Sequence, residues 1–345
     1  MKLLSICDPT QYGSPPLDVP TFYQKLSLDP KLDFYHIPTP QVFTSQFPQV
    51  QTAPSVGDLP YKAFLKLGEH AQHWLSLHDI DVVFCRTLKP FPIGYLDALV
   101  TWEKVVRFVN RPSGKKEQMK SEFLLRIARD YIPETIVTAN WTTALAFFEQ
   151  FQVIVAKQAN SCGGRGVFKI WYGDGTFHVD NIVTGKQSWS TFAAVMAQLQ
   201  TNQTEPLQFC RYLSRTNAGD KRVVVVDGEI YGSYLRRSQS GHWVNNVSSD
   251  GGCTLADITT DEVDAIHRTV GKYQALGLHT LGYDFLLDDD GTWRISEINA
   301  GNIGGFARLE LLTGQPVMDR LISWMLDYAQ RTDAQIDSST MVGVA

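Results

Sequence analysis

The sequence predicts an α/β fold, with α+β elements, that is divided into several compact units. The chain has 345 residues, more than a single hydrophobic core usually organises. Two short apolar runs, Leu3–Cys7 and Val82–Cys85, have the composition of buried strands in an α/β sheet. Later in the chain, polar turns separate strand-like runs in hairpin patterns, and Asp261–Leu276 has the periodicity of a long helix.

The composition excludes several classes of protein. Hydrophobic residues make up 43% of the chain and charged residues 19%, which is typical of globular proteins and not of disordered ones. The net charge is −5 and the isoelectric point is about 5.9. Because a duplex-binding protein needs a concentrated basic surface, we expect no nucleic-acid partner.

The cysteines and the apolar runs predict where the protein resides. The five cysteines are scattered and have no metal-ligand spacing, so reduced thiols are expected. The apolar run at the N-terminus is very short, which predicts a buried strand and not a signal peptide. No run approaches the length of a membrane span, so we expect no membrane partner and a cytoplasmic location.

Changes of pattern divide the chain into successive units. The turn-rich run Asn110–Gly114 marks a first boundary. On either side of it, helical periodicity predicts a helix over Tyr61–Leu77 and another over Lys116–Tyr131. The boundaries that we predict give four parts: 1–112, 113–206, 207–332 and a flexible tail, 333–345.

The segment Tyr283–Asn299 contains the pattern most informative about function. Two apolar runs flank the turn Asp288–Gly291, which predicts an antiparallel hairpin. Glu297 and Asn299 lie on the same face of its second strand, because residues two apart point the same way. The hairpin can bring Asp284 opposite them, and such oxygen ligands suit Mg²⁺ bound together with phosphates. The alternative is a solvated acidic face without a metal.

A strand that ends in Lys157 leads into a glycine-rich loop, which predicts a phosphate-binding site. Because Gly163, Gly164 and Gly166 lack Cβ atoms, backbone N–H groups can approach a polyphosphate there. Lys157 would supply a positive charge to the phosphates. The loop joins two strands and lacks the Gly-Lys-Ser/Thr sequence, so it is neither a Walker A loop nor a Rossmann fingerprint. The alternative is that the glycines serve only the turn.

Another hairpin pattern, Gly219–Tyr231, places Asp220 and Arg222 on one face of a strand. Arg222 opens a run of valines, so its guanidinium is expected near a ligand or a carboxylate. The alternative is an ordinary edge ion pair, which contributes little. The second strand leads to Arg236–Arg237, which suits a clamp for a carboxylate or phosphate or, equally, a solvated charge pair.

In this order, these elements resemble the ATP-grasp superfamily of carboxylate–amine ligases. The chain is most similar to prokaryotic glutathione synthetase and next to the ribosomal-protein glutamate ligases, over most of residues 80–310. The motifs that carry the resemblance are Val83–Thr87 followed by Pro90–Phe91, Pro133–Thr135 with Val137–Thr138, and Gly219–Val223 followed by Val225–Glu229.

The resemblance implies an ATP-grasp fold preceded by a Rossmann-like, pre-ATP-grasp substrate domain. Residues 1–112 would form the substrate domain, 113–206 the central lid subdomain and 207–332 the catalytic subdomain. The residues that it implies for ATP binding are Lys120, Lys157, Gly163, Gly164, Gly166, Gln208, Arg211, Tyr212, Leu213 and Asp220. The hinge formed by residues 211–213 would receive the adenine through backbone atoms.

The resemblance also implies a catalytic set. Arg222 would contact the γ-phosphate, Arg237 the acyl substrate or acyl phosphate, and Asn246 the transferred phosphate. The residues implied for two Mg²⁺ ions, or Mn²⁺, are Asp284, Glu297 and Asn299, with Glu297 bridging. The cofactors implied are therefore ATP, as a substrate, and a divalent cation.

The implied reaction is ATP-dependent amide-bond formation through an acyl phosphate. The leading expectation is that γ-glutamylcysteine and glycine are joined to glutathione, with release of ADP and phosphate. The partners would be small-molecule acid and amine substrates, and the family resemblance implies a homo-oligomer, either a dimer or a tetramer. The alternatives are another small acid–amine pair, a protein C-terminus as substrate, or a module that binds nucleotide without turnover.

Two stretches depart from the family pattern. Around the first lysine the chain reads Glu117–Glu122 in place of Asn/Asp-x-Lys-Leu. After Asn299 it continues as Ala300–Phe306, where glutathione synthetases usually have a sequence rich in Thr/Ser and Pro near the acceptor-amine pocket. The identity of the amine therefore stays open.

Overall fold

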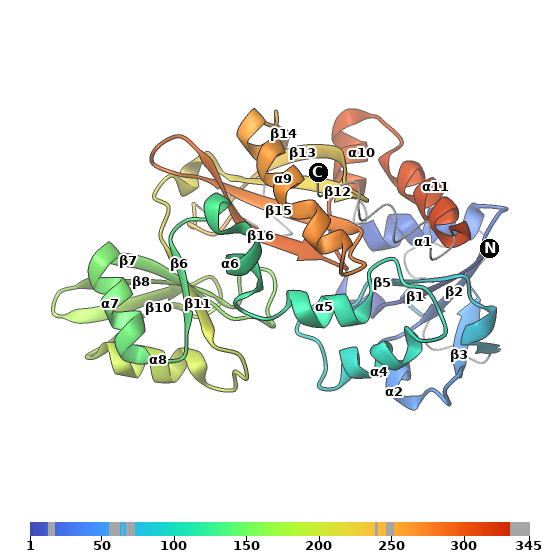
Figure 1. Cartoon of the computed structure of the whole chain (residues 1–345), viewed down its shortest axis with the longest axis horizontal. Coiled ribbons are helices and arrows are strands. Elements are labelled where there is room, and N and C mark those ends of the chain that lie inside the picture. Colours follow the sequence, from blue (N-terminus) through green and yellow to red (C-terminus); the bar gives the residue numbers. More distant parts are fainter. Residues whose placement is uncertain are drawn as a thin grey trace.

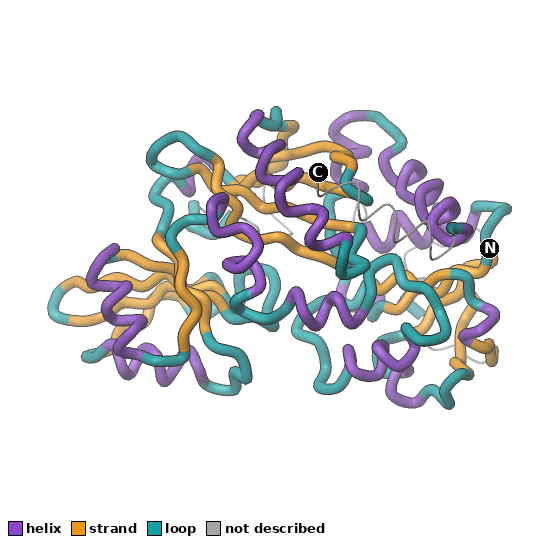
Figure 2. Tube along the Cα trace, in the orientation of Figure 1, coloured by secondary structure: helices purple, strands orange, loops and turns teal. Residues whose placement is uncertain are grey.

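Three β-sheets organise the part of the chain that the structure describes, one in each successive part of the sequence (Figure 1). The computed structural model describes residues 1–12, 18–54, 63, 65–66, 73–238, 241–245 and 252–331. Helices pack against each sheet, as the colouring by secondary structure shows (Figure 2). The predicted α/β fold with additional antiparallel sheets is confirmed.

The N-terminal sheet has parallel strands at its centre. Its strands are β1 (Lys2–Ile6), β2 (Asp33–Ile37), β3 (Gln49–Pro54), β4 (His73–Ser76) and β5 (Val82–Cys85). They lie in the order β4-β3-β2-β1-β5, and β1 runs parallel to both β2 and β5. The carboxyl ends of these three strands therefore meet at one edge, where ligands bind in open α/β sheets.

The middle sheet is antiparallel throughout. Its strands are β6 (Thr135–Thr138), β7 (Val153–Lys157), β8 (Val167–Gly173), β9 (Thr176–Asn181), β10 (Gly185–Trp189) and β11 (Leu207–Arg211). They lie in the order β10-β9-β8-β7-β11-β6. The glycine loop connects the paired strands β7 and β8 at one end of this sheet.

The C-terminal sheet is also antiparallel and contains the two hairpins expected from the sequence. Its strands are β12 (Asp220–Val226), β13 (Glu229–Arg237), β14 (Gly252–Leu255), β15 (Thr280–Leu287) and β16 (Trp293–Ala300). They lie in the order β14-β13-β12-β15-β16. The hairpin β15–β16 pairs Asp284 with Glu297, as the sequence pattern predicted.

Some of the helices begin where the sequence supplies a capping signal. Their bounds are α1 (Asp18–Leu28), α2 (Gln41–Thr44), α4 (Tyr95–Trp102), α5 (Pro112–Gln118), α6 (Phe123–Ala128), α7 (Trp141–Phe151), α8 (Phe192–Gln200), α9 (Thr260–Gln274), α10 (Phe306–Thr313) and α11 (Val317–Gln330). A capping box formed by Thr259 and Glu262 starts α9, and Pro112 occupies the first turn of α5. Short 3₁₀ turns span Pro9–Gln11, Leu77–Asp79, Arg129–Tyr131 and Thr216–Ala218.

The first and last parts of the chain share one hydrophobic core. Phe22 of α1 and Phe84 of β5 pack in the same cluster as Phe306 of α10 and Met325 of α11. In Figure 1, α10 and α11 accordingly lie beside α1. The middle sheet instead has its own core, to which α7 and α8 contribute apolar residues such as Phe148. The middle sheet is therefore the separately packed unit of the molecule.

Several expectations about local structure are corrected. The end of the helix expected over Tyr61–Leu77 is the strand β4, which pairs with β3; most of the rest of that segment lies outside the described residues. The helix expected over Lys116–Tyr131 is divided into α5 and α6. Strand β11 pairs with β6 and β7 and so belongs to the middle sheet. The tail 333–345 lies outside the described residues.

Among the described residues, no helix is both long enough and apolar enough to span a membrane.

Candidate active site

A cavity of about 190 Å³ is lined by residues from both the middle and the C-terminal sheets. Apolar side chains such as Val155, Leu286 and Ile298 contribute to its wall, which suits the base of a nucleotide. The predicted site residues that line this cleft are Lys120, Lys157, Gly163, Gly164, Gly166, Gln208, Arg211, Tyr212, Leu213, Asp220, Asp284 and Glu297.

The glycine loop has a backbone that favours glycine. Gly163 and Gly164 have positive φ angles of 63° and 77°, which residues with a Cβ rarely adopt. At Gly166 a Cβ atom would come within 2.5 Å of the Ser161 side chain. Lys157 precedes the loop, and its Nζ donates to the backbone oxygen of Ser296 at 2.7 Å. The lysine of the middle sheet thus reaches across the cleft to β16.

A cluster of charged side chains lies on one face of the C-terminal sheet. The Arg222 Nε and Nη2 atoms donate to the two carboxylate oxygens of Asp284 at 2.5 and 2.8 Å. Arg236 Nη2 donates to Asp284 at 2.7 Å and to Asp220 at 2.8 Å. The two arginines therefore hold two buried carboxylates close together.

The cluster shifts the acidity of both carboxyl groups. Burial raises the pKa of Asp220 to about 6, and the negative charge of Asp284 acts in the same direction, while Arg236 opposes it. Burial also opposes ionisation of Asp284, but Arg222 and Arg236 outweigh it and lower its pKa. The Oδ1 atom of Asp220 is buried and has no hydrogen-bond partner among the described residues. Such an oxygen is available to a ligand.

The predicted metal ligands offer hard oxygen donors. Asp284 and Glu297 are paired across the hairpin, and Asn299 Nδ2 donates to Asp284 at 3.2 Å, which leaves the Asn299 amide oxygen available. Among the described residues, no three His, Cys, Asp or Glu side chains converge as a complete metal site. The donors instead amount to two carboxylates and one amide, and Mg²⁺ at a phosphate site often takes only one or two carboxylates. The residues present fit a cation that is shared with phosphates.

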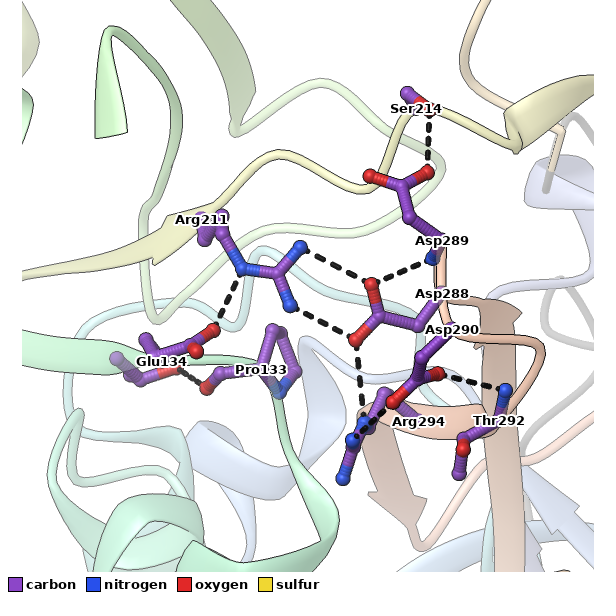
Figure 3. A network of polar contacts seen from close by, with 10 residues as sticks. Pro133, Glu134, Arg211, Ser214, Asp288, Asp289, Asp290, Thr292 and Arg294 are labelled. Atoms are coloured by element: carbon purple, nitrogen blue, oxygen red, sulfur yellow. Dashed lines mark hydrogen bonds and ion pairs between the residues drawn. The ribbon is translucent and has the colours of Figure 1, made fainter.

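The hinge beside the cleft is fixed by side chains (Figure 3). Arg211, at the end of β11, donates through Nη1 and Nη2 to Asp288 at 3.0 and 2.8 Å, and through Nε to Glu134 at 2.6 Å. Ser214 donates to Asp289 in the same turn. The backbone N–H groups of Arg211 and Tyr212 are also used within the protein, by Glu134 and Val153. Arg211 therefore joins the middle sheet to the β15–β16 turn.

A family model described as the ATP-grasp domain of prokaryotic glutathione synthetase matches residues 122–314. The chain belongs to this family. It is therefore an ATP-grasp ligase, an enzyme that forms C–N bonds, and the enzymes of this superfamily use ATP and Mg²⁺. The matched segment includes both hairpins and the glycine loop.

Curated relatives of this ATP-grasp ligase are distant. The glutathione synthetase of Prochlorococcus marinus subsp. pastoris is 24% identical over 333 residues, which cover 95% of this chain and 99% of the relative. The glutathione synthetase of Salmonella typhimurium is 27% identical over 233 residues, or 65% of this chain and 66% of the relative.

Solved structures agree on the fold of the ligase. D-cycloserine synthetase DcsG superposes with a TM-score of 0.62 at 12% identity, over 94% of this chain and all of that one (100%). The D-Ala:D-Ser ligase VanG from Enterococcus faecalis gives a TM-score of 0.61 at 12% identity, over 93% and 98% of the two chains.

Not every residue predicted for this ATP-grasp ligase faces its cleft. Lys120 lines the cleft, but its side chain is half exposed and pairs with Glu117 at 2.6 Å. Arg237 is exposed at the end of β13. Asn246 lies outside the described residues; its neighbour Asn245 is buried and donates to the Thr216 backbone oxygen at 2.6 Å.

The sequence analysis named Arg236 and Arg237 as a pair but assigned the substrate role to Arg237 alone, for a reason visible in β13. A regular hairpin around Asp227–Gly228 would place Leu235 opposite Asp220, so that Arg237 would share the inner face. A bulge between Val224 and Val225 shifts the register by one residue and places Arg236 opposite Asp220. Because one step along a strand reverses the side chain, Arg236 points toward the acidic cluster in place of Arg237. The only signal in the sequence is that two arginines occur in succession.

Proposed function

We propose that this ATP-grasp ligase activates a carboxylic acid as an acyl phosphate and transfers the acyl group to a small amine, with γ-glutamylcysteine and glycine as the leading pair. The observation that carries the proposal is the arrangement of Lys157, the glycine loop and Asp284, which Arg222 contacts, around one cleft. The glutathione synthetase family model and the distant relatives of that name support the choice of substrates.

The first half of the reaction needs charge neutralisation around the transferred phosphoryl group. Lys157 and the backbone of Gly163–Gly166 would bind the phosphates from the side of the middle sheet. Arg222 and Arg236 would act from the C-terminal sheet, where charge develops as the phosphoryl group moves to the acid. The bond from the γ-phosphorus to the bridging oxygen of ADP breaks as a bond to the substrate carboxylate oxygen forms.

The divalent cation would be held by Glu297, Asp284 and the Asn299 amide oxygen, together with ATP. When bound, it supplies positive charge that neutralises the phosphate oxygens. Asp284 is engaged by Arg222 and Arg236, but the phosphates offer both guanidinium groups another anionic partner. We propose that ATP binding thereby makes the Asp284 carboxylate available to the cation.

In the second half of the reaction the amine nitrogen attacks the acyl carbon, and inorganic phosphate leaves with the electron pair of the C–O bond. The amine must lose a proton in this step. Water has to be excluded, because it would hydrolyse the acyl phosphate. The glycine loop, which reaches Lys89 of the N-terminal domain through Cys162 at 2.9 Å, lies where it can cover the reacting groups.

The decisive experiment is phosphate release from Mg-ATP by the full-length protein with single acids, single amines and their pairs. We expect release that requires γ-glutamylcysteine and glycine together, with glutathione identified by mass spectrometry. Release with a different pair would retain the ligase reaction and replace the substrates. ATP binding without release for any pair would favour a protein C-terminus outside the panel or a module without turnover.

A further inference from the structure

The segment after the predicted metal ligands is held by the N-terminal part of the chain. Lys115 Nζ donates to the backbone oxygen of Ala300 at 2.7 Å. Asn110 Nδ2 donates to the oxygen of Gly301, and Asn302 Nδ2 donates to the oxygen of Arg86 at 2.7 Å. This is the stretch in which the sequence departs from glutathione synthetases. These contacts place residues 300–302 where the two ends of the chain meet.

Lys115 carries a buried amine that has no carboxylate partner among the described residues. The residue is 7% exposed, and its Nζ has two hydrogen bonds, both to neutral oxygens: Ala300 O and, at 2.6 Å, Gln118 Oε1. No carboxylate pairs with it among the described residues, so its third N–H and its charge remain unmatched. A buried charge is costly unless an opposite charge accompanies it.

A small pocket lies beside Lys115. It has a volume of about 30 Å³ and is bounded by the loop after β5, by α4 and by residues 301–302. Phe91 and Tyr95 form an apolar wall, and Lys115, Asn110 and Asn302 are polar lining residues. Because one water needs roughly 10–15 Å³ of such space, the pocket has room for two or three non-hydrogen atoms. A carboxylate or a very small side chain fits, and a large side chain does not.

The small pocket adjoins the ATP cleft through one residue. Gln118 lines the ATP cleft, accepts a hydrogen bond from Lys115, and donates to the backbone oxygen of Ile298 at 3.1 Å. Ile298 follows Glu297, one of the predicted metal ligands. A small molecule anchored at Lys115 would therefore lie next to the end of the cleft where the acyl phosphate is expected. Figure 1 shows α5, which contains Lys115, at the junction of the N-terminal part with the rest of the molecule.

We propose that this pocket binds the carboxylate of a small amino-acid acceptor, with Lys115 as its cationic partner. The inference rests on the proposed ligase function, because it assigns the acceptor subsite of that reaction. With the carboxylate at Lys115, almost none of this volume is left for a side chain, so the pocket favours glycine or an amino acid of nearly the same size. It also gives a structural role to Ala300 and Gly301, whose backbone oxygens position Lys115 and Asn110.

The electrostatics of Lys115 are consistent with an anionic ligand. Burial lowers the pKa of Lys115 well below its ordinary value; the charge of Lys89 acts in the same direction and that of Glu297 opposes it. A bound carboxylate would favour the protonated amine, since opposite charges at short range favour the ionised forms of both groups.

The test is equilibrium dialysis of radiolabelled glycine against the full-length protein with Mg-ADP, in the wild type and in Lys115→Met. We expect glycine to bind the wild type, and to bind Lys115→Met at least tenfold more weakly. Lys116→Met is the matched control, because Lys116 lies on the same helix, is half exposed and pairs with Asp97. Glycine binding that Lys115→Met does not change, or no binding to the wild type, would overturn the proposal.

A second variant keeps the test decisive if Lys115→Met does not fold. Phe91→Ala removes a half-buried ring from the pocket wall, so it should improve binding of L-alanine or L-serine relative to glycine. An unchanged order of preference would count against the pocket. The wild type could also bind glycine through Lys115 and yet make no glutathione. That outcome would reject the proposed substrate pair and retain the acceptor subsite.

Discussion

Arg211 and Asp288 are joined by two parallel hydrogen bonds between the planar ends of their side chains, at 3.0 and 2.8 Å. The pair links the last residue of β11 in the middle sheet to the β15–β16 turn of the C-terminal sheet (Figure 3). Paired bonds of this kind fix orientation as well as distance. The two sheets that form the cleft are therefore fastened together at one end.

Asp288→Asn should destabilise the protein and weaken ATP binding, because it removes the charge that faces Arg211. Asp288 has a side chain that is only 4% exposed, so we expect a loss of about 1–3 kcal/mol in the free energy of unfolding. Urea unfolding and ATP titration measure the two effects. The control is Asp290→Asn in the same turn, where the carboxylate is half exposed and pairs with Arg294. Equal effects from both variants would contradict a special role for Asp288.

Glu297→Gln should preserve the fold and abolish turnover, because it keeps the shape of the side chain and removes a negative charge from the proposed cation site. We expect the phosphate-release rate to fall by about a hundredfold or more, in line with the loss of a group that stabilises the transition state. Glu149→Gln on the exposed side of α7 is the control. Near-normal turnover in Glu297→Gln, with an unchanged melting temperature, would reject the assignment.

The two successive arginines of β13 should differ in their importance. Arg236→Ala should reduce turnover strongly, because Arg236 contacts Asp220 and Asp284 in the buried cluster. Arg237→Ala should change turnover by less than about threefold, since an exposed charge of this kind contributes little. Steady-state phosphate release from the two variants compares them directly. A larger loss of turnover in Arg237→Ala than in Arg236→Ala would mean that β13 lacks the bulge.

Asp227→Asn should reduce stability at neutral pH and have less effect in acid. Burial opposes ionisation of Asp227, but hydrogen bonds from His279 and Arg331 and from Trp324 outweigh it and lower its pKa. The stabilisation is present above the ordinary carboxyl pKa of about 4 and is lost as the pH falls below it. Urea unfolding at several pH values between about 3 and 7 measures the change.

The control for this prediction is Asp174→Asn. Asp174 has nearly the same positive φ angle as Asp227, 50° against 51°, and it occupies another Asp-Gly turn, but it is exposed. A difference between wild type and Asp227→Asn that stays constant with pH would mean that the lost stability does not come from the ionised carboxylate.

The alkylation rates of the cysteine thiols should show whether a nucleotide occupies the cleft. Cys162 lines the cleft and is half buried, so Mg-ATP should slow its alkylation by about tenfold or more, as expected when a ligand occupies the site. Cys253 on β14 serves as an internal reference. Cys7 should not react, because burial raises its pKa to about 12 and the thiolate is the reactive form. Mass spectrometry after timed labelling gives all three rates. Equal Cys162 labelling with and without Mg-ATP would contradict the proposed placement of the nucleotide.

The parts that the sequence predicted are those that depend on local pattern. The Tyr283–Asn299 hairpin follows from strand residues on either side of an acidic turn, and it forms as expected. The glycine loop was predicted because glycines come directly after a strand that ends in Lys157, and it connects β7 to β8 as expected. In both cases neighbouring residues determine the structure, so a short stretch of sequence is sufficient.

The parts that the sequence did not predict depend on distant contacts. Arg211 and Asp288 are separated by 77 positions, so nothing near either residue indicates the pair. Strand β4 forms in a stretch of helical periodicity because it pairs with β3. The shift from Arg237 to Arg236 comes from a single bulge, which local propensity does not reveal.

The core that joins Phe22 and Phe84 to Phe306 and Met325 has a consequence for how the protein is made. During synthesis the N-terminal sheet emerges from the ribosome long before α10 and α11 do. One of its faces must therefore stay without its final cover while the middle sheet, which has its own core, can already fold. The core of the N-terminal sheet is thus completed only when α10 and α11 have been translated, and a chain arrested before residue 306 would expose an apolar surface that attracts chaperones.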